Sequence, residues 1–322
     1  PDLFIMAVDE QQDIILNSLQ LNDNNIFTEM PGTVFPGLFT GNCEWADYDN
    51  DGDPDLIIAG QTADPNSSVT RLYLNDPVGR LIENTSQELI GLKGAAFRFV
   101  DLDGDGDLDL VMSGWNKFDG LTSKIYINEP LGSFSPALSQ IEFGVAYGSI
   151  DAIDFDLDGL KDLVIAGADS VSNYAADVHS LSCRVYKNNG DLTFSEIKLI
   201  PGGRTARFAN INQDSLPDLV VNGTTGIGNP DSTFCRVYTN TIEETNESPS
   251  PPLALTAFAV STRSIFTWGS GTDDHDDPVS LSYNLRIGTS PGGNDLLSSA
   301  IPVHNTNIGA RLLREFVEIF HG

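Results

Sequence analysis

The sequence predicts an all-β protein made of repeated four-stranded antiparallel sheets, and three observations lead to this prediction. An acidic motif, D-x-D-x-D-G-x-x-D, recurs about every 54 residues along the chain. Each copy is accompanied by short segments rich in valine, isoleucine, tyrosine and phenylalanine, bounded by glycine, asparagine and aspartate. No helical periodicity runs through these segments. Four antiparallel strands per repeat are typical of the blade of a β-propeller.

The acidic motif has four copies. In the clearest copy, FVDLDGDGDLDLVMSG, aspartates occupy every second position from Asp101 to Asp109. The other copies are ADYDNDGDPDLIIAG at 46–60, IDFDLDGLKDLVIAG at 153–167 and ANINQDSLPDLVVNG at 209–223. Because four copies at a nearly constant spacing do not arise by chance, each copy is expected to mark one blade.

Each repeat predicts its strands in the same order. The first strand is the apolar segment before the acidic loop, such as AAFRFV at 95–100, and the second is the run that follows it, such as DLVMSG at 109–114. The third strand ends in an aromatic residue near an asparagine, as in RLYLN, KIYIN, RVYKN and RVYTN. A fourth apolar segment, for example LTFSEIKLI at 192–200, closes the first three units. Since one blade cannot bury both of its faces, the blades are expected to stack around an axis.

The two ends of the repeat region predict incomplete blades. The first residues, PDLFIMAV, match the second-strand part of the motif, and NSLQLND and NIFTEM supply the third and fourth strands of that unit. At the other end, RVYTN at 236–240 has no fourth strand after it. We therefore expect about five blade units over residues 1–241 and interpret them as a fragment that lacks N-terminal blades.

The acidic loops predict a bound cation. Two carboxylates about 4 Å apart repel each other by roughly 1 kcal/mol in water and by about 4 kcal/mol at an effective dielectric constant of 20. Positions 1, 3, 5 and 9 of the motif offer side-chain oxygens, position 7 offers a backbone carbonyl, and the glycine at position 6 allows a sharp turn. Hard oxygen ligands in this number suit Ca²⁺. The predicted ligands are Asp47, Asp49, Asp51, the carbonyl of Asp53 and Asp55 in the first loop; Asp101, Asp103, Asp105, the carbonyl of Asp107 and Asp109 in the second; and Asp154, Asp156, Asp158, the carbonyl of Leu160 and Asp162 in the third.

The fourth loop is a weaker calcium candidate. Its ligands would be Asn210, Asn212, Asp214, the carbonyl of Leu216 and Asp218. Asparagine can bind through its amide oxygen, but the two substitutions lower the negative charge, and Ser215 stands where glycine is expected. For every loop the alternative is a solvated acidic turn, and occupancy of the fourth loop stays open.

These units resemble FG-GAP/VCBS repeats, the family that includes the propeller of the integrin α-chain. The calcium motif with its following Asp-Leu and apolar strand carries the resemblance over residues 1 to about 242, and the FG-GAP signature stands at 143–148 (FGVAYG). The resemblance implies a seven-bladed propeller, of which the five units would be a part. It also implies calcium in the first turn of each blade and a role in extracellular adhesion or ligand recognition.

The composition changes after the repeats. Residues 242–252, IEETNESPSPP, predict an extended linker. Beyond it, LALTAFAV, SIFTWGS and VSLSYNLRIG predict three strands, and Trp268 and Tyr283 resemble the core of a fibronectin type III-like domain. This β-sandwich would be partial within residues 253–322. The tail ARLLREFVEIFHG has apolar residues at helical spacing, which leaves a helix and an irregular tail as alternatives.

Composition also narrows the function. The net charge of −29 argues against nucleic acid and anionic membrane surfaces as partners, and no apolar run reaches the roughly 18 residues of a membrane span. We find no G-x-S-x-G or H-E-x-x-H motif and predict no enzyme, although a glycosidase carboxylate pair is defined only by its separation in space. Cys183 and Cys235 stand at equivalent places in neighbouring units, about 10 Å apart, and are not expected to be bonded to each other.

The leading hypothesis is an extracellular, secreted or cell-surface calcium-binding module that recognises a protein or glycan ligand. Further domains or blades of the same parent chain are expected as neighbours. The alternatives are a structural spacer of a large surface protein and a carbohydrate-active propeller enzyme. We expect ligand contact on the length-variable loops between second and third strands, at the opposite end from the calcium loops. Candidate contact residues there are Trp115, Phe118 and Tyr174, which could instead pack under their own loops.

Overall fold

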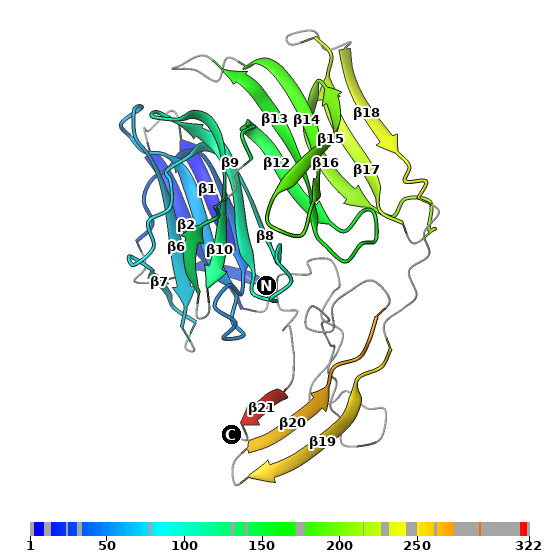
Figure 1. The fold of residues 1–322 in the computed structure, drawn as a ribbon. Coiled ribbons are helices and arrows are strands. Elements are labelled where there is room, and N and C mark those ends of the chain that lie inside the picture. Colours follow the sequence, from blue (N-terminus) through cyan, green and yellow to red (C-terminus); the bar gives the residue numbers. More distant parts are fainter. Residues whose placement is uncertain are drawn as a thin grey trace.

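The structure of the chain is a computed structural model (Figure 1). It describes residues 3–9, 14–23, 25–30, 34–76, 79–129, 132–138, 141–171, 178–214, 216–226, 232–242, 250–260, 263–273, 290 and 316–320. These residues form strands and turns and contain no α-helix. The described part of the chain therefore has no helix of the length and apolar character that a membrane span needs.

Strands β1 to β18 form five antiparallel sheets in chain order. The first sheet holds β1 (Leu3–Asp9), β2 (Ile14–Asp23) and β3 (Ile26–Glu29). The second holds β4 (Phe39–Ala46), β5 (Asp55–Gln61), β6 (Ser68–Asn75) and β7 (Leu81–Glu83). The third holds β8 (Lys93–Val100), β9 (Asp109–Asn116), β10 (Gly120–Glu129) and β11 (Ser133–Pro136). The fourth holds β12 (Ala146–Ile153), β13 (Asp162–Val171), β14 (Val178–Asn188) and β15 (Phe194–Pro201), and the fifth holds β16 (Gly203–Ala209), β17 (Asp218–Thr224) and β18 (Thr233–Tyr238).

These sheets confirm the predicted all-β fold of four-stranded propeller blades. In the three complete blades, the second to fourth, each strand pairs with the next one along the chain, and the acidic loop joins the first strand to the second. The first described sheet lacks a first strand and the last lacks a fourth, as the repeat alignment predicted. Figure 1 shows the blades side by side, with the first strands of successive complete blades next to each other.

The second strand of each complete blade is buried on both faces. In β5, Leu56 and Ile58 pack into the apolar cluster shared with the preceding blade, whereas Ile57 and Ala59 pack into the cluster shared with the following blade. Since successive side chains of a strand point to opposite faces, both faces need apolar residues. This is why the motif is followed by an unbroken apolar run rather than by an alternating pattern.

A ladder of alternating charge crosses the first strands of four blades. Its members, three residues before each acidic loop, are Glu44, Arg98, Asp151 and Arg207. The guanidinium of Arg98 lies 4.0 Å from Glu44 Oε1 and 3.3 Å from Asp151 Oδ1. Burial raises the pKa of Glu44 to about 7, while the charge of Arg98 acts to lower it. The ladder links neighbouring blades with charges of opposite sign, and sequence analysis did not identify it.

The FGVAYG segment requires glycine at two positions because neighbouring backbones lie very close to it. A Cβ on Gly144 would lie 2.2 Å from the Thr122 nitrogen, and one on Gly148 would lie 1.8 Å from the Ala166 oxygen. Tyr147, between them, has a φ of 55° at a shift in the β12–β13 register. The segment is therefore a β-bulge at which only glycine leaves room for the neighbouring strands.

A sixth sheet follows the propeller blades. It consists of β19 (Leu253–Val260), β20 (Arg263–Gly269) and β21 (Phe316–Phe320), and Trp268 on β20 is buried. Two of the three predicted strands are thus present, whereas Tyr283 and its segment lie outside the described residues. The domain limits and the fibronectin type III-like assignment stay predictions.

The helical alternative for the tail is wrong for residues 316–320. These residues form β21, which pairs antiparallel with β20 from Thr267↔Phe316 to Arg263↔Phe320. The segment FVEIF consists mainly of residues that favour strands, and pairing satisfies backbone groups along one edge of β20. Tertiary pairing therefore overrode the helical spacing of the apolar residues.

The three cysteines are free. Cys183 on β14 is completely buried, and this burial raises the pKa of its thiol to about 12. Cys235 on β18 is exposed.

Candidate metal centre

The first three acidic loops share one backbone turn, and the described part of the fourth loop begins in the same way. The fourth position has a positive φ in each loop, with values of 60° at Asn50, 76° at Gly104, 60° at Leu157 and 64° at Gln213. The sixth position is also left-handed, with φ of 100° at Gly52, 85° at Gly106 and 88° at Gly159. This confirms the sharp turn predicted from the motif glycine; Ser215, at the sixth position of the fourth loop, lies outside the described residues. Leucine rarely adopts this conformation, so Leu157 is held there by the rest of its loop.

The last aspartate of each loop is buried at the start of the second strand. Asp55 is 1% exposed and accepts backbone N–H groups from Tyr48, at 3.2 Å, and from Asn75, at 2.9 Å. The same two bonds, from loop position 2 and from the asparagine that follows the third-strand aromatic, recur at Asp109, Asp162 and Asp218. The buried carboxylate therefore anchors the loop to the rest of its blade.

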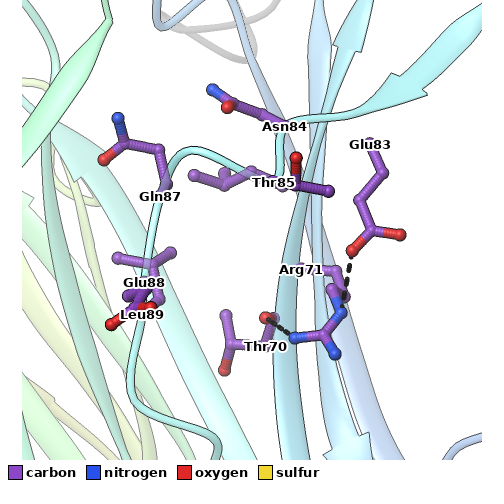
Figure 2. Close-up of a pocket in the computed structure, with 9 residues that line it drawn as sticks. Thr70, Arg71, Glu83, Asn84, Thr85, Gln87, Glu88 and Leu89 are labelled. Atoms are coloured by element: carbon purple, nitrogen blue, oxygen red, sulfur yellow. Dashed lines mark hydrogen bonds and ion pairs between the residues drawn. The ribbon is translucent and has the colours of Figure 1, made fainter.

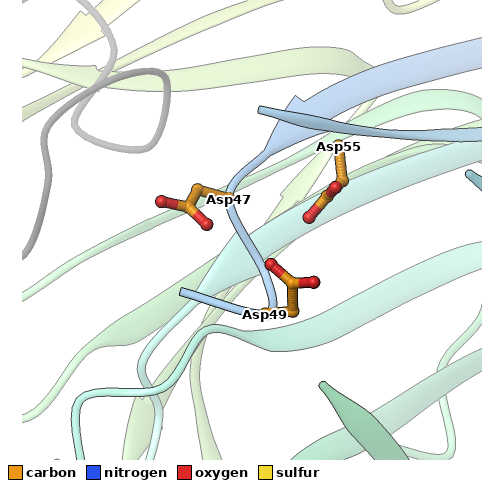
Figure 3. A group of neighbouring side chains, drawn as sticks. All are labelled: Asp47, Asp49 and Asp55. Atoms are coloured by element: carbon orange, nitrogen blue, oxygen red, sulfur yellow. The ribbon is translucent and has the colours of Figure 1, made fainter. Parts of the chain in front are cut away.

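Three aspartates converge in each of the first three loops. Positions 1, 3 and 9 supply carboxylate oxygens that lie within 4.8 Å of one another, and Figure 3 shows this group in the first loop. The three groups are Asp47, Asp49 and Asp55; Asp101, Asp103 and Asp109; and Asp154, Asp156 and Asp162.

The carboxylates at position 5 are not part of these groups. Asp51, Asp105 and Asp158 are exposed, and each accepts the N–H of position 7, at 2.9, 2.8 and 3.0 Å. Position 7 is occupied by Asp53, Asp107 and Leu160. The roles of positions 5 and 7 as ligands stay predictions.

Without a cation, burial and mutual repulsion destabilise the ionised form of these aspartates. Burial raises the pKa of Asp55 and Asp109 to about 8 and that of Asp162 to about 7. Neighbouring aspartates raise these pKa values further, while the backbone N–H donors lower them. The donor set of each group consists only of carboxylate oxygens, which suits a hard cation such as Ca²⁺.

The fourth loop lacks a comparable group of carboxylates. Asn212 donates a side-chain N–H to Asp214 Oδ2 at 2.6 Å, so an amide partly offsets the charge that aspartates share elsewhere. Asp218 keeps the buried anchoring position, and Asn210 takes the place of the first aspartate. Calcium binding by this loop stays a prediction.

The third-strand asparagine ties each of the first three acidic loops to the next blade. The side-chain amide of Asn128 donates to the Tyr48 carbonyl of the preceding loop at 2.6 Å. Asn188 and Asn240 make the same bond to Leu102 and Phe155, at 2.8 and 2.6 Å. The sequence showed the recurrent asparagine but not its role, because its acceptor lies about 80 residues earlier in a neighbouring blade.

Lys187 is a second residue that sequence analysis missed. Its ammonium group contacts Asp156 Oδ2 and lies 2.6 Å from Asp158 Oδ2, both in the third loop. The matching residue just before the asparagine is Leu74, Ile127 or Thr239 in the other three units with an acidic loop. The signal was the lysine in RVYKN, the only cation at the position just before the asparagine among RLYLN, KIYIN, RVYKN and RVYTN.

The candidate ligand-contact residues have different positions. Phe118 lies in the turn at 117–119 and is 83% exposed, with the Lys117 ammonium 4.9 Å from its ring centroid. Trp115 is not in a loop, contrary to expectation, but in β9, paired with Lys93 and Leu121. The hairpin is tighter than predicted because Asn116 caps the turn and Gly120 adopts a φ of 71°. Tyr174 lies outside the described residues.

A shallow hollow of about 440 Å³ lies between β6, β7 and the segment leading to β8 (Figure 2). Arg71 reaches into it and pairs with Glu83 at 2.9 Å, while also donating to the Thr70 carbonyl at 3.2 Å. Arg71 and Glu83 thus neutralise each other, and Glu88 is the third charged residue of the lining.

A comparison with known protein families identifies the same repeats. A model described as FG-GAP-like repeat matches three overlapping stretches, residues 47–112, 101–165 and 154–221. Each match begins at the first aspartate of a loop and ends in the second strand of the next blade. Together they span more than half of the chain. No curated protein matches the sequence significantly.

Proposed function

We propose a calcium-binding function for this chain, which belongs to the family of FG-GAP-like repeat proteins. The observation that carries the proposal is the recurrence of one convergent group of three aspartates in three successive loops. Each group concentrates negative charge on a backbone turn that is conserved in geometry between the loops. A cation in each loop would offset this repulsion, which is the reason to expect metal rather than water there.

The residues of each loop would have different roles in binding the ion. The buried aspartate at position 9 is fixed by two backbone N–H groups, so its carboxylate needs no further ordering on binding. Positions 1 and 3 already lie beside it, and positions 5 and 7 would complete the oxygen ligands. Because the position 9 aspartate also begins the second strand, an ion bound to it would stabilise the blade as well as the loop.

We further propose an extracellular location, secreted or at a cell surface. Repeats of this family occur in extracellular proteins. Loops of this type match weak calcium sites with Kd of about 10⁻⁴ to 10⁻³ M. Such sites fill at the millimolar calcium levels outside cells and would stay empty in the cytosol.

Calorimetric titration of the full chain with CaCl₂ tests the proposed function. We expect calcium to bind and magnesium to bind much more weakly, because magnesium demands tighter octahedral geometry. Asp103→Ala should remove one binding event, since Asp103 is an exposed member of the second group. Asp119→Ala, which removes an exposed aspartate from the β9–β10 turn, is the matched control. Absence of calcium binding by the unmodified protein would refute the proposal.

For recognition, we propose the end of the propeller opposite the calcium loops. The β8–β9 acidic loop and the β9–β10 turn lie at opposite ends of β9, which at eight residues is roughly 25 Å long. Phe118 presents an aromatic ring on that turn, and exposed aromatic residues favour binding of protein or glycan. A spacer role and a carbohydrate-active role are the alternatives.

The Phe118→Ala variant tests this assignment. It should weaken capture of a protein or glycan identified with the unmodified chain, while calcium-dependent melting stays unchanged because Phe118 contributes little to the core. If binding persists in this variant but is lost in variants of the calcium-loop end with normal stability, the assignment of ends is wrong.

A further inference from the structure

The third acidic loop differs from the first two in charge. The first and second loops contain five aspartates each and no basic residue, whereas the third contains four aspartates and Lys161. Lys187 of β14 adds a second positive charge, which contacts the aspartates at loop positions 3 and 5. The third loop therefore carries much of its own neutralising charge, which the first two lack.

The third loop also differs in how its aspartate at position 3 is paired. Asp154 accepts backbone N–H groups on both oxygens, from Asp158 at 3.1 Å and from Gly159 at 2.9 Å. In the second loop, by contrast, the N–H of Asp105 is donated to Asp103 at position 3, at 3.2 Å. In the third loop, the position 3 carboxylate of Asp156 instead receives the ammonium of Lys187. Ion pairing thus replaces a backbone hydrogen bond within the loop.

We propose that Lys187 is an internal counter-ion of the third loop, which competes with calcium for Asp156 and Asp158. The proposal rests on the proposed calcium function and specifies how one site is regulated. Calcium must displace the ammonium before it can use these two carboxylates, so the third loop binds calcium more weakly than the first and second loops. For the same reason, the third loop keeps its structure better when calcium is removed.

The affinity difference can be estimated from the contacts. The Lys187 side chain is 34% exposed, and its partners Asp156 and Asp158 are 19% and 32% exposed. Two such partly exposed pairs, each with a modest strength, together amount to about a tenfold effect on calcium affinity. Removing the lysine should lower the Kd of the third loop by that factor.

Hydrogen exchange with mass spectrometry over a calcium titration tests the proposal on the full chain, because it reports on each loop separately. In the unmodified protein, the amides of 154–162 should require about ten times more calcium for half-maximal protection than those of 101–109. Lys187→Ile, which introduces the residue found at position 127, should bring the two midpoints together. It should also lower protection of 154–162 in EDTA.

The reciprocal variant keeps the proposal testable if Lys187→Ile folds poorly. Ile127→Lys places an ammonium at the matching position of the second loop and should raise the calcium midpoint of 101–109 by about tenfold, leaving 47–55 unchanged. Unchanged midpoints in both variants, with a clear calcium response in the first and second loops, would overturn the role of Lys187 alone. No calcium response in any loop of the unmodified protein would overturn the calcium function and this proposal with it.

Discussion

Removal of calcium with EDTA is expected to lower the melting temperature of this protein by on the order of 10 °C. At 2 mM calcium and a Kd near 10⁻⁴ M, each occupied loop adds about 1.8 kcal/mol to the free energy of unfolding. The first and second loops together therefore contribute roughly 3.6 kcal/mol. Differential scanning calorimetry in EDTA and in 2 mM CaCl₂ measures the difference, with MgCl₂ as the control for a general effect of divalent charge.

The pH dependence of the same measurement distinguishes loop binding from an indirect effect of calcium. Without the ion, the pKa values of Asp55 and Asp109 are raised to about 8 in the folded state, against about 3.9 in the unfolded chain. The folded state then binds more protons between these values, so the EDTA form should lose stability as the pH rises from 5 to 8. Calcium favours the ionised carboxylates and should flatten this loss. Identical melting curves with and without calcium across this range would contradict both expectations.

The Asn128→Ala substitution is expected to destabilise the protein by about 3 kcal/mol, because it leaves two buried carbonyl groups without a donor. The Asn128 amide is 2% exposed and donates to Tyr48 O at 2.6 Å in the preceding blade and to Leu108 O at 3.1 Å in its own blade. The backbone N–H that Asn128 donates to Asp109 remains in the variant. The change therefore removes only the side-chain contacts, one to the preceding blade and one within the same blade.

Asn75→Ala is the matched control for this prediction. Asn75 occupies the same place in its blade and also donates its backbone N–H to the buried aspartate. Its side-chain amide donates to Pro54 O at 3.2 Å, within its own blade. We expect its loss to cost about 1 kcal/mol, the usual net value of one hydrogen bond. Urea unfolding of both variants gives the comparison from midpoints at unchanged slope. Equal costs would show that the bond between blades adds nothing beyond the local one.

The repeated units could be predicted from the sequence because their determinants are local. The glycine at position 6, the spaced aspartates and the apolar run after them specify a turn followed by a strand buried on both faces. The residues 46–60 carry all of these signals within a single segment, and so do the next two copies. The order of strands, the incomplete first and last sheets and the convergence of aspartates at positions 1 and 9 all follow from that pattern.

Two local conformations could not be predicted from their own segments, because pairing with other strands determines them. Trp115 was expected in a loop, yet pairing with Lys93 and Leu121 extends β9 past it. The tail at 316–320 has helical spacing, yet it forms a strand because β20 offers it an edge. In both places the partner strand provides hydrogen bonds that local preference cannot outweigh.

By itself, the sequence determined the all-β repeat architecture and the acidic loops that could hold calcium. Only the tertiary structure decided which side chains act between repeats. The stacking of blades places Arg98 between Glu44 and Asp151, which its own segment does not indicate. In the same way, the position of β14 places Lys187 beside the third loop. The physical reason is that turn geometry and strand burial are properties of neighbouring residues, whereas charge pairing depends on distances in space that the folded chain alone establishes.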